Sequence, residues 1–179
     1  MSQTRIDGRL GGHVDGMDIH CVYTGDEISG RLGGVLVGCD VDLAYDSAAG
    51  TVHGRFGGVL IGRSLQLSIQ GNVAHGRFGG LVDGMDVSLG LSQLEPGGAT
   101  RISGRCGGRV MGFDCELRLD PTGGLLNGRL GGSVIGKDVE LQVGETPPLI
   151  AAALAVCAYA YYLFLHRNSG SHGGGGSRR

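Results

Sequence analysis

Apolar and polar residues alternate along short segments of residues 1–146, and the phase of the alternation changes within each pair of segments. Between residues 28 and 36, glycine and apolar residues occupy the even positions, whereas in residues 41–45 the apolar residues occupy odd positions. Strict alternation predicts a β-strand with one face in a core, and a change of phase predicts a turn between two strands. The pattern therefore predicts β-hairpins.

The hairpin pattern occurs six times, as G-R-[L/F/C]-G-G-x-[V/L]-x-G-x-[D/S] followed by a second apolar alternation. The copies begin at Gly8, Gly30, Gly54, Gly76, Gly104 and Gly128, at spacings of 22 to 28 residues. Such repetition predicts one supersecondary unit for each copy. We therefore expect residues 1–146 to form an all-β repeat domain of six Gly-rich β-hairpins, with about twelve antiparallel strands. The alternative is a β-solenoid with one coil for each repeat.

The ninth motif position is glycine in every copy, for example Gly38 in the second. We place a two-residue type II′ turn there, because the first residue of that turn needs a positive φ. In the first copy this turn predicts that Val14 pairs with Ile19. It also predicts that Leu10 pairs with Tyr23, so that all apolar positions share one face. A sheet of twelve strands with one apolar face must close, fold over itself or pair with another copy.

Residues 149–165 form an apolar run, LIAAALAVCAYAYYLFL, without a charged side chain. A helix of this length spans about 25 Å, which is enough for a thin bilayer. The run is apolar on all sides, which disfavours a helix lying at the membrane surface. We therefore expect a transmembrane helix over residues 147–166 that contacts membrane lipid through 149–165, followed by a flexible Gly/Arg tail over 167–179. The alternative is a helix buried in the β domain.

The position of this helix predicts a tail-anchored, single-pass membrane protein whose repeat domain is cytoplasmic. The N-terminal residues lack the apolar stretch of a signal peptide. A small-x-x-x-small pair, Ala151 and Ala155, permits close packing of helices, and we expect a homo-oligomer.

The charge balance argues against nucleic acid as a partner. Residues 1–146 carry all 17 acidic residues and only 12 of the 15 basic ones. A protein that neutralises phosphates needs a basic face, which this composition does not favour. The high glycine content, 38 of 179 residues, indicates an architecture built on turns and close strand contacts.

The five cysteines predict neither a disulfide framework nor a zinc knuckle, because their number is odd and no C-x-x-C occurs. Cys21, Cys106 and Cys115 replace apolar residues of other copies, so we expect them in the core, whereas Cys39 lies in the predicted turn and is expected to be exposed. His53 and His75 are expected at the surface.

The first hairpin holds one cluster that resembles a metal site. In the predicted register His13 faces His20 and Asp15 faces Asp18, all on the polar side. Two imidazoles and a carboxylate can hold a divalent metal. No other copy repeats this cluster, so we assign no metal. The motifs of common enzymes are also absent from the sequence, and we predict no catalytic, cofactor-binding or metal-binding residue and no cofactor.

Two rows of charged side chains recur on the polar face. The arginines at the second motif position are Arg9, Arg31, Arg55, Arg77, Arg105 and Arg129. The aspartates beside the turns are Asp18, Asp40, Asp86, Asp114 and Asp138. We expect structural roles: the arginines pair with acids such as Asp46 and Asp120, and the aspartates hydrogen-bond the turn backbone. The alternative is that the arginines bind phosphates or lipid headgroups.

These observations predict a non-catalytic, membrane-anchored β-repeat scaffold or self-assembling interaction module. One alternative is a membrane-disrupting effector that oligomerises into a pore. Another is a soluble closed barrel that encloses its own helix or a small ligand.

Overall fold

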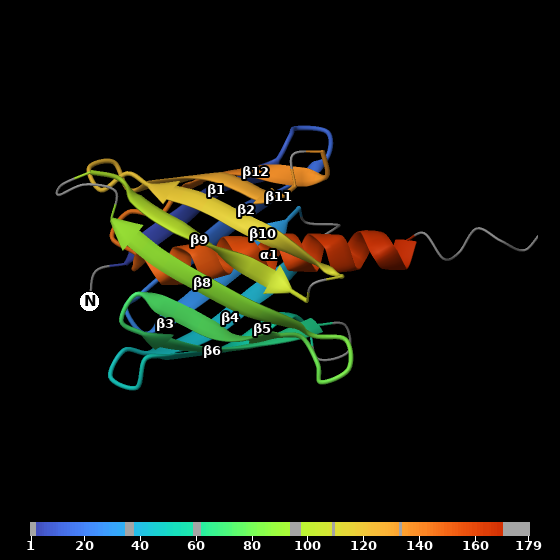
Figure 1. Cartoon of the computed structure of the whole chain (residues 1–179), viewed down its shortest axis with the longest axis horizontal. Coiled ribbons are helices and arrows are strands. Elements are labelled where there is room, and N and C mark those ends of the chain that lie inside the picture. Colours follow the sequence, from blue (N-terminus) through green and yellow to red (C-terminus); the bar gives the residue numbers. More distant parts are fainter. Residues whose placement is uncertain are drawn as a thin grey trace, which may run out of the picture.

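The computed structural model describes residues 3–34, 38–58, 62–93, 98–108, 110–132 and 134–169. Within them, twelve antiparallel strands form a closed barrel around one helix, α1 (Figure 1). Each strand pairs with the strands before and after it in sequence, and β1 closes the barrel by pairing with β12. The predicted hairpins are confirmed, and the solenoid alternative is wrong because neighbouring strands are antiparallel.

The elements follow the repeats, because each copy of the motif forms one hairpin of an odd and an even strand. The strands are β1 (Thr4–Gly11), β2 (Gly16–Tyr23), β3 (Glu27–Gly33), β4 (Gly38–Asp46), β5 (Thr51–Gly57), β6 (Gly62–Gln70), β7 (Val73–Phe78), β8 (Met85–Gln93), β9 (Thr100–Gly107), β10 (Gly112–Leu119), β11 (Leu125–Gly131) and β12 (Gly136–Gln142), and the helix is α1 (Pro148–Ser169).

The turn within each hairpin lies earlier than predicted. In the first hairpin Gly11 pairs with Gly16, and Leu10 pairs with Met17 instead of Tyr23. The two strands are therefore joined by four residues, 12–15. Gly11 has a φ of 78°, a left-handed conformation that glycine adopts without steric cost, so the chain leaves the strand there. The ninth-position glycine begins the second strand, and the predicted type II′ turn is wrong.

The four residues between the fourth and ninth motif positions are called a tip below: residues 12–15, 80–83, 108–111 and 132–135 in the first, fourth, fifth and sixth hairpins. Residues 35–37 and 59–61 of the other two tips lie outside the described residues, as do residue 109 of the fifth tip and residue 133 of the sixth. The described residues of the tips lie at one end of the barrel, the tip end, and the described residues that join successive hairpins lie at the other, the linker end.

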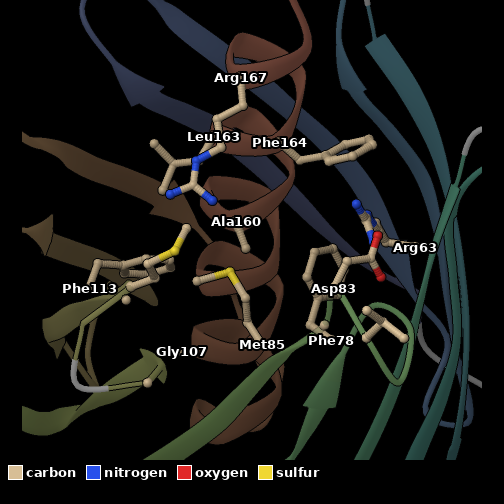
Figure 2. A pocket seen from close by; sticks show the side chains of 15 residues that line it. Arg63, Phe78, Asp83, Met85, Gly107, Phe113, Ala160, Leu163, Phe164 and Arg167 are labelled. Carbon is tan, nitrogen blue, oxygen red and sulfur yellow. The ribbon is translucent and has the colours of Figure 1, made fainter.

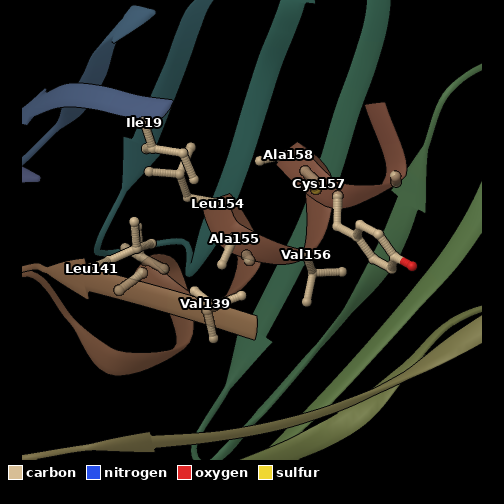
Figure 3. Close-up of a cluster of buried hydrophobic side chains, with 14 of the residues drawn as sticks. Ile19, Val139, Leu141, Leu154, Ala155, Val156, Cys157 and Ala158 are labelled. Atoms are coloured by element: carbon tan, nitrogen blue, oxygen red, sulfur yellow. The ribbon is translucent and has the colours of Figure 1, made fainter. Parts of the chain in front are cut away.

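The barrel lumen is filled by α1, which enters at the linker end after β12 and leaves at the tip end (Figure 1). Residues 149–162 of α1 are all buried. Figure 3 shows Leu154 and Val156 of the helix in one cluster with the wall side chains Ile19, Val139 and Leu141. A helix that is apolar on all sides suits this place, because the wall surrounds it completely.

The helix is also long and apolar enough to cross a membrane. Residues 148–167 have a mean hydropathy of 1.9, but 78% of the apolar window is buried inside the barrel. In this structure α1 is the core of the barrel, as in the alternative of a closed barrel around its own helix. A membrane span over residues 147–166 and a membrane location stay predictions.

Candidate functional site at the tip end

The motif arginines hold the tips in place. In each hairpin the guanidinium donates to the carbonyl oxygen of the glycine three residues later, at 3.1 Å for Arg55 to Gly58 and 3.0 Å for Arg105 to Gly108. Five of these six arginines also form ion pairs with the aspartate row across the hairpin. The pairs are Arg9–Asp18, Arg31–Asp40, Arg77–Asp86, Arg105–Asp114 and Arg129–Asp138.

The two charged rows therefore pair with each other, which differs from the predicted partners. Asp46 and Asp120 lie at the linker end, where they accept hydrogen bonds from the backbone of their own turns, for example Ala48 N to Asp46 at 2.9 Å. Thr122 donates from its hydroxyl and its backbone to Asp120, and these bonds lower the pKa of that carboxyl. The arginines were expected to pair with acids, and they do, but with the aspartate that lies two residues after the ninth-position glycine of the hairpin.

The structure does not assemble the histidine cluster of the first hairpin. His20 faces Asp7, with 2.9 Å between Nδ1 and Oδ1, while His13 is exposed on the tip. Asp18 pairs with Arg9 and Asp15 pairs with Lys137. The predicted pairing of His13 with His20 is wrong because the register differs. Among the described residues, no group of three His, Cys, Asp or Glu side chains is placed to hold a metal.

The cysteines all lie in the core. Cys21, Cys106 and Cys115 are buried, as predicted, and burial raises the pKa of each thiol to about 12. Cys39 is also buried, so the expectation of an exposed turn cysteine is wrong; burial raises its pKa to about 11. Because the thiolate is the reactive form, these side chains are poor nucleophiles in the closed barrel.

The tips expose apolar side chains instead of burying them. Of the eight large apolar side chains that are exposed in the described residues, seven lie on tips: Val14, Leu81, Val82, Val110, Met111, Val134 and Ile135. Val14 is fully exposed, whereas the predicted register placed it in the core against Ile19. The sequence held a signal for this outcome, because the seventh motif position is always Val or Leu and is flanked by glycines that favour a loop.

The end of α1 lies among these tips. Leu163, Phe164 and Leu165 are only partly buried, unlike the residues before them. Tyr162 donates its hydroxyl proton to Asp15 of the first tip. Arg63 of β6 lies 3.9 Å from the centre of the Phe164 ring. The last turns of the helix and the tips therefore form one surface that is rich in aliphatic side chains.

Two ion pairs brace this surface. Asp15 pairs with Lys137 of β12, and Asp83 of the fourth tip pairs with Arg63. The hydrogen bonds from Lys137 and then Tyr162 hold the pKa of Asp15 below its ordinary value, and the hydrogen bond from Arg63 does the same for Asp83. The pKa of Lys137 is raised in turn by Asp15. The first and fourth tips are thus held to neighbouring strands by an ion pair at their base.

A cavity of about 510 Å³ opens at the tip end between α1 and the wall (Figure 2). The helix contributes Ala160, Leu163, Phe164 and Arg167, whose spacing of three and four residues places them on one face. The wall contributes apolar side chains and one ion pair: Phe78, Met85, Phe113 and the pair Arg63–Asp83. An apolar cavity of this size with few polar groups is typical of a ligand site.

No protein-family model, curated protein or solved structure is significantly similar to the chain. The function proposed next is therefore argued from the geometry of the tip end.

Proposed function

We propose that the protein is a non-catalytic module that docks on the surface of a lipid bilayer through its tip end, with α1 as the core of the barrel. The observation that carries the proposal is the concentration of exposed aliphatic side chains on the tips around the end of α1. Exposed apolar patches of this kind mark sites of interaction with a protein or a membrane.

The residue types favour lipid over a protein partner. The exposed tip residues are Val, Leu, Ile and Met, whereas the residues that dominate protein interfaces are Trp, Tyr and Arg. The described residues of the first, fourth, fifth and sixth tips expose one or two large apolar side chains in each tip, which suits shallow insertion at the boundary of headgroups and acyl chains. The outer face of the barrel wall carries charged side chains, including the arginine and aspartate rows, and suits water.

Vesicle flotation of the full chain tests the proposal. The test variant replaces one valine on each of four tips: Val14→Ser, Val82→Ser, Val110→Ser and Val134→Ser. All four side chains are at least 91% exposed, so the fold loses little packing. Burying a valine side chain contributes about 1.5 kcal/mol, so we expect partitioning to phosphatidylcholine vesicles to fall about 100-fold or more.

The matched control is Val73→Ser, because Val73 is the one large exposed apolar side chain of the described residues at the linker end, with 47% exposure. It should bind vesicles like the wild type. Equal binding by the four-serine variant and the wild type would overturn the proposal.

A second candidate function is favoured by the composition of α1. Its length and hydropathy would let it cross a bilayer if it left the lumen, as the predicted membrane anchor and the pore-forming alternative both require. The barrel would then be a sheath that keeps a membrane helix out of water until it reaches a bilayer.

Thiol labelling distinguishes docking from release of α1. Cys115 is buried in the wall facing the lumen, and burial raises its pKa to about 12. If the helix leaves, water reaches the lumen and the pKa should fall towards its ordinary value of about 8.5, with faster reaction with a maleimide at neutral pH. A variant with Cys115 as its only cysteine should stay unreactive on vesicles if α1 stays in place. Labelling that requires vesicles would favour release.

A further inference from the structure

We propose that the cavity beside α1 binds a single-chain anionic amphiphile, with the acyl chain against the apolar walls and the headgroup at Arg167. The inference rests on the proposed function in taking the tip end as the end that meets lipid. It adds a site for one lipid-like molecule, which docking through the tips does not require.

The walls of the cavity suit an acyl chain. Phe78 and Phe113 are buried wall side chains that border it, and Met85 and Leu163 are partly buried beside them. Ala160 leaves room on the helix, because a larger side chain at this position would project into the cavity. Glycines of the fourth and fifth hairpins also border it, so its rim is partly backbone. Such walls can bind a flexible chain but offer few hydrogen bonds to a polar ligand.

The charges at the mouth suit an anion. The cavity is lined by two guanidinium groups, Arg63 and Arg167, and one carboxylate, Asp83. Asp83 neutralises Arg63, whose guanidinium also lies over the Phe164 ring. Arg167 is exposed and forms no ion pair within the part of the chain that the structure describes. One positive charge therefore remains, at the edge of an apolar cavity, where a guanidinium binds carboxylate or phosphate well.

The two sides of the mouth are visible in Figure 2, where Arg167 and Arg63 lie on opposite sides of the last turns of α1. The cavity is bordered by Val82 and Met111, which are exposed on their tips. A molecule in the cavity would thus lie where the tips approach lipid. It can come from a bilayer or, as a monomer, from water.

The test measures binding of two monomeric probes, laurate and a lysophosphatidate, to the full chain by calorimetry below the concentration at which each aggregates. Arg167→Glu should weaken binding of at least one probe about tenfold or more, because a charge-assisted contact becomes a repulsion. Arg167→Lys should stay within about threefold of the wild type, since it keeps the charge. The matched control, Arg118→Glu, makes the same charge change on the outer wall and should have no effect.

A second variant tests the place of the acyl chain. Ala160→Leu fills the cavity from the helix and should abolish binding, while a thermal melt confirms that the barrel is folded. The probe whose affinity falls more in Arg167→Glu identifies the preferred headgroup, a carboxylate for laurate or a phosphate for lysophosphatidate. The inference is wrong if Arg167→Glu and Arg118→Glu bind both probes equally, or if dodecyltrimethylammonium binds as tightly as laurate.

The outcome for the proposed function is separate. If the wild type binds the monomers through Arg167 but does not float with vesicles, the cavity site is supported and the docking function is refuted. If the wild type floats with vesicles through its tips but binds neither monomer, the docking function is supported and the cavity site is refuted.

Discussion

The two ends of the barrel are built differently from the same six hairpins. At the tip end the connections have one length, and the described tips expose aliphatic side chains. At the linker end the connections vary in length and are polar, with turns capped by side chains such as Asp46 and Asp120. Copies of a motif that serve only to build a wall need not match at either end. The uniform length and the apolar character of the described tips agree with the docking function proposed for this end.

The largest expected difference between the two ends concerns a left-handed glycine at each. Gly131 precedes the sixth tip with a φ of 91°, and a Cβ there would lie 2.7 Å from the carbonyl oxygen of Ile135. Gly71 at the linker end has a φ of 57° and nothing within 4 Å of a Cβ. We expect Gly131→Ala to cost about 3 kcal/mol or more in the free energy of unfolding, and Gly71→Ala about 1 kcal/mol. Urea denaturation measures both, and equal losses would contradict the contrast.

A smaller effect is expected when one tip loses its arginine. Arg105→Gln removes an ion pair with Asp114 and the hydrogen bonds to the carbonyl of Gly108. These groups are partly exposed, so the loss in unfolding free energy should be about 1 kcal/mol. The matched control is Arg118→Gln, an exposed arginine on the neighbouring strand, which should change stability by less than about 0.5 kcal/mol. A loss at position 118 as large as at 105 would show that the tip contacts add nothing specific.

The smallest effect is the response to acid. The pKa values of Asp15 and Asp83 are lowered by their cationic partners, so each carboxylate stabilises the fold above its unfolded pKa of about 3.9. This contribution is lost as the pH falls through the lower folded pKa. Asp83→Asn should therefore lower the melting temperature at neutral pH, and the difference from the wild type should vanish once the pH is below the lowered pKa of Asp83.

Added salt should affect the aspartates at the two ends differently. The pKa of Asp120 at the linker end is lowered by hydrogen bonds from Thr122, not by a cation. Added salt should weaken the effect of Asp83→Asn and leave that of Asp120→Asn nearly unchanged, because ions screen charges but not short hydrogen bonds. The same salt response at both positions would mean that the ion pair at the tip contributes little.

The wall of the barrel could be predicted from the sequence because its pattern is local and repeated. Alternation placed Leu10 and Ile19 on the inner face, and both are fully buried. The register was wrong by an even number of residues, which keeps every strand residue on its predicted face. The error changed which residues face each other, so His20 faces Asp7 instead of His13. At the tips it also changed burial, because Val14 was placed in the core and is exposed. The missing information was that the glycine at the fourth motif position has a left-handed conformation. The sequence has a glycine at both the fourth and the ninth positions, and either could have formed the turn.

The place of α1 could not be decided from its residues. A helix that is apolar on all sides suits either a bilayer or a closed core, and residues 149–162 carry no signal that separates the two. Closure of the barrel depends on the pairing of β1 with β12, which joins distant segments such as Gly8 and Leu141. Pairing over such a distance is not specified by the alternation within either strand. The cavity depends on the place of α1 in the lumen and on the closure of the barrel. The one sign of it in the sequence is Arg167, a charged residue just beyond the apolar run.

The barrel wall and the helix inside it differ in symmetry. The wall repeats six times, but a helix has 3.6 residues in each turn, so no helix can present the same side chain to six equivalent neighbours. The face of Ala160 leaves space, whereas the face of Tyr159 packs edge to face with Phe113 at 4.6 Å between ring centres. Six similar hairpins thus become six different neighbours of α1, and the side chains of the helix determine which hairpins border the cavity. Substitutions in α1 alone would then be enough to change the shape of this cavity while the six repeats stay the same.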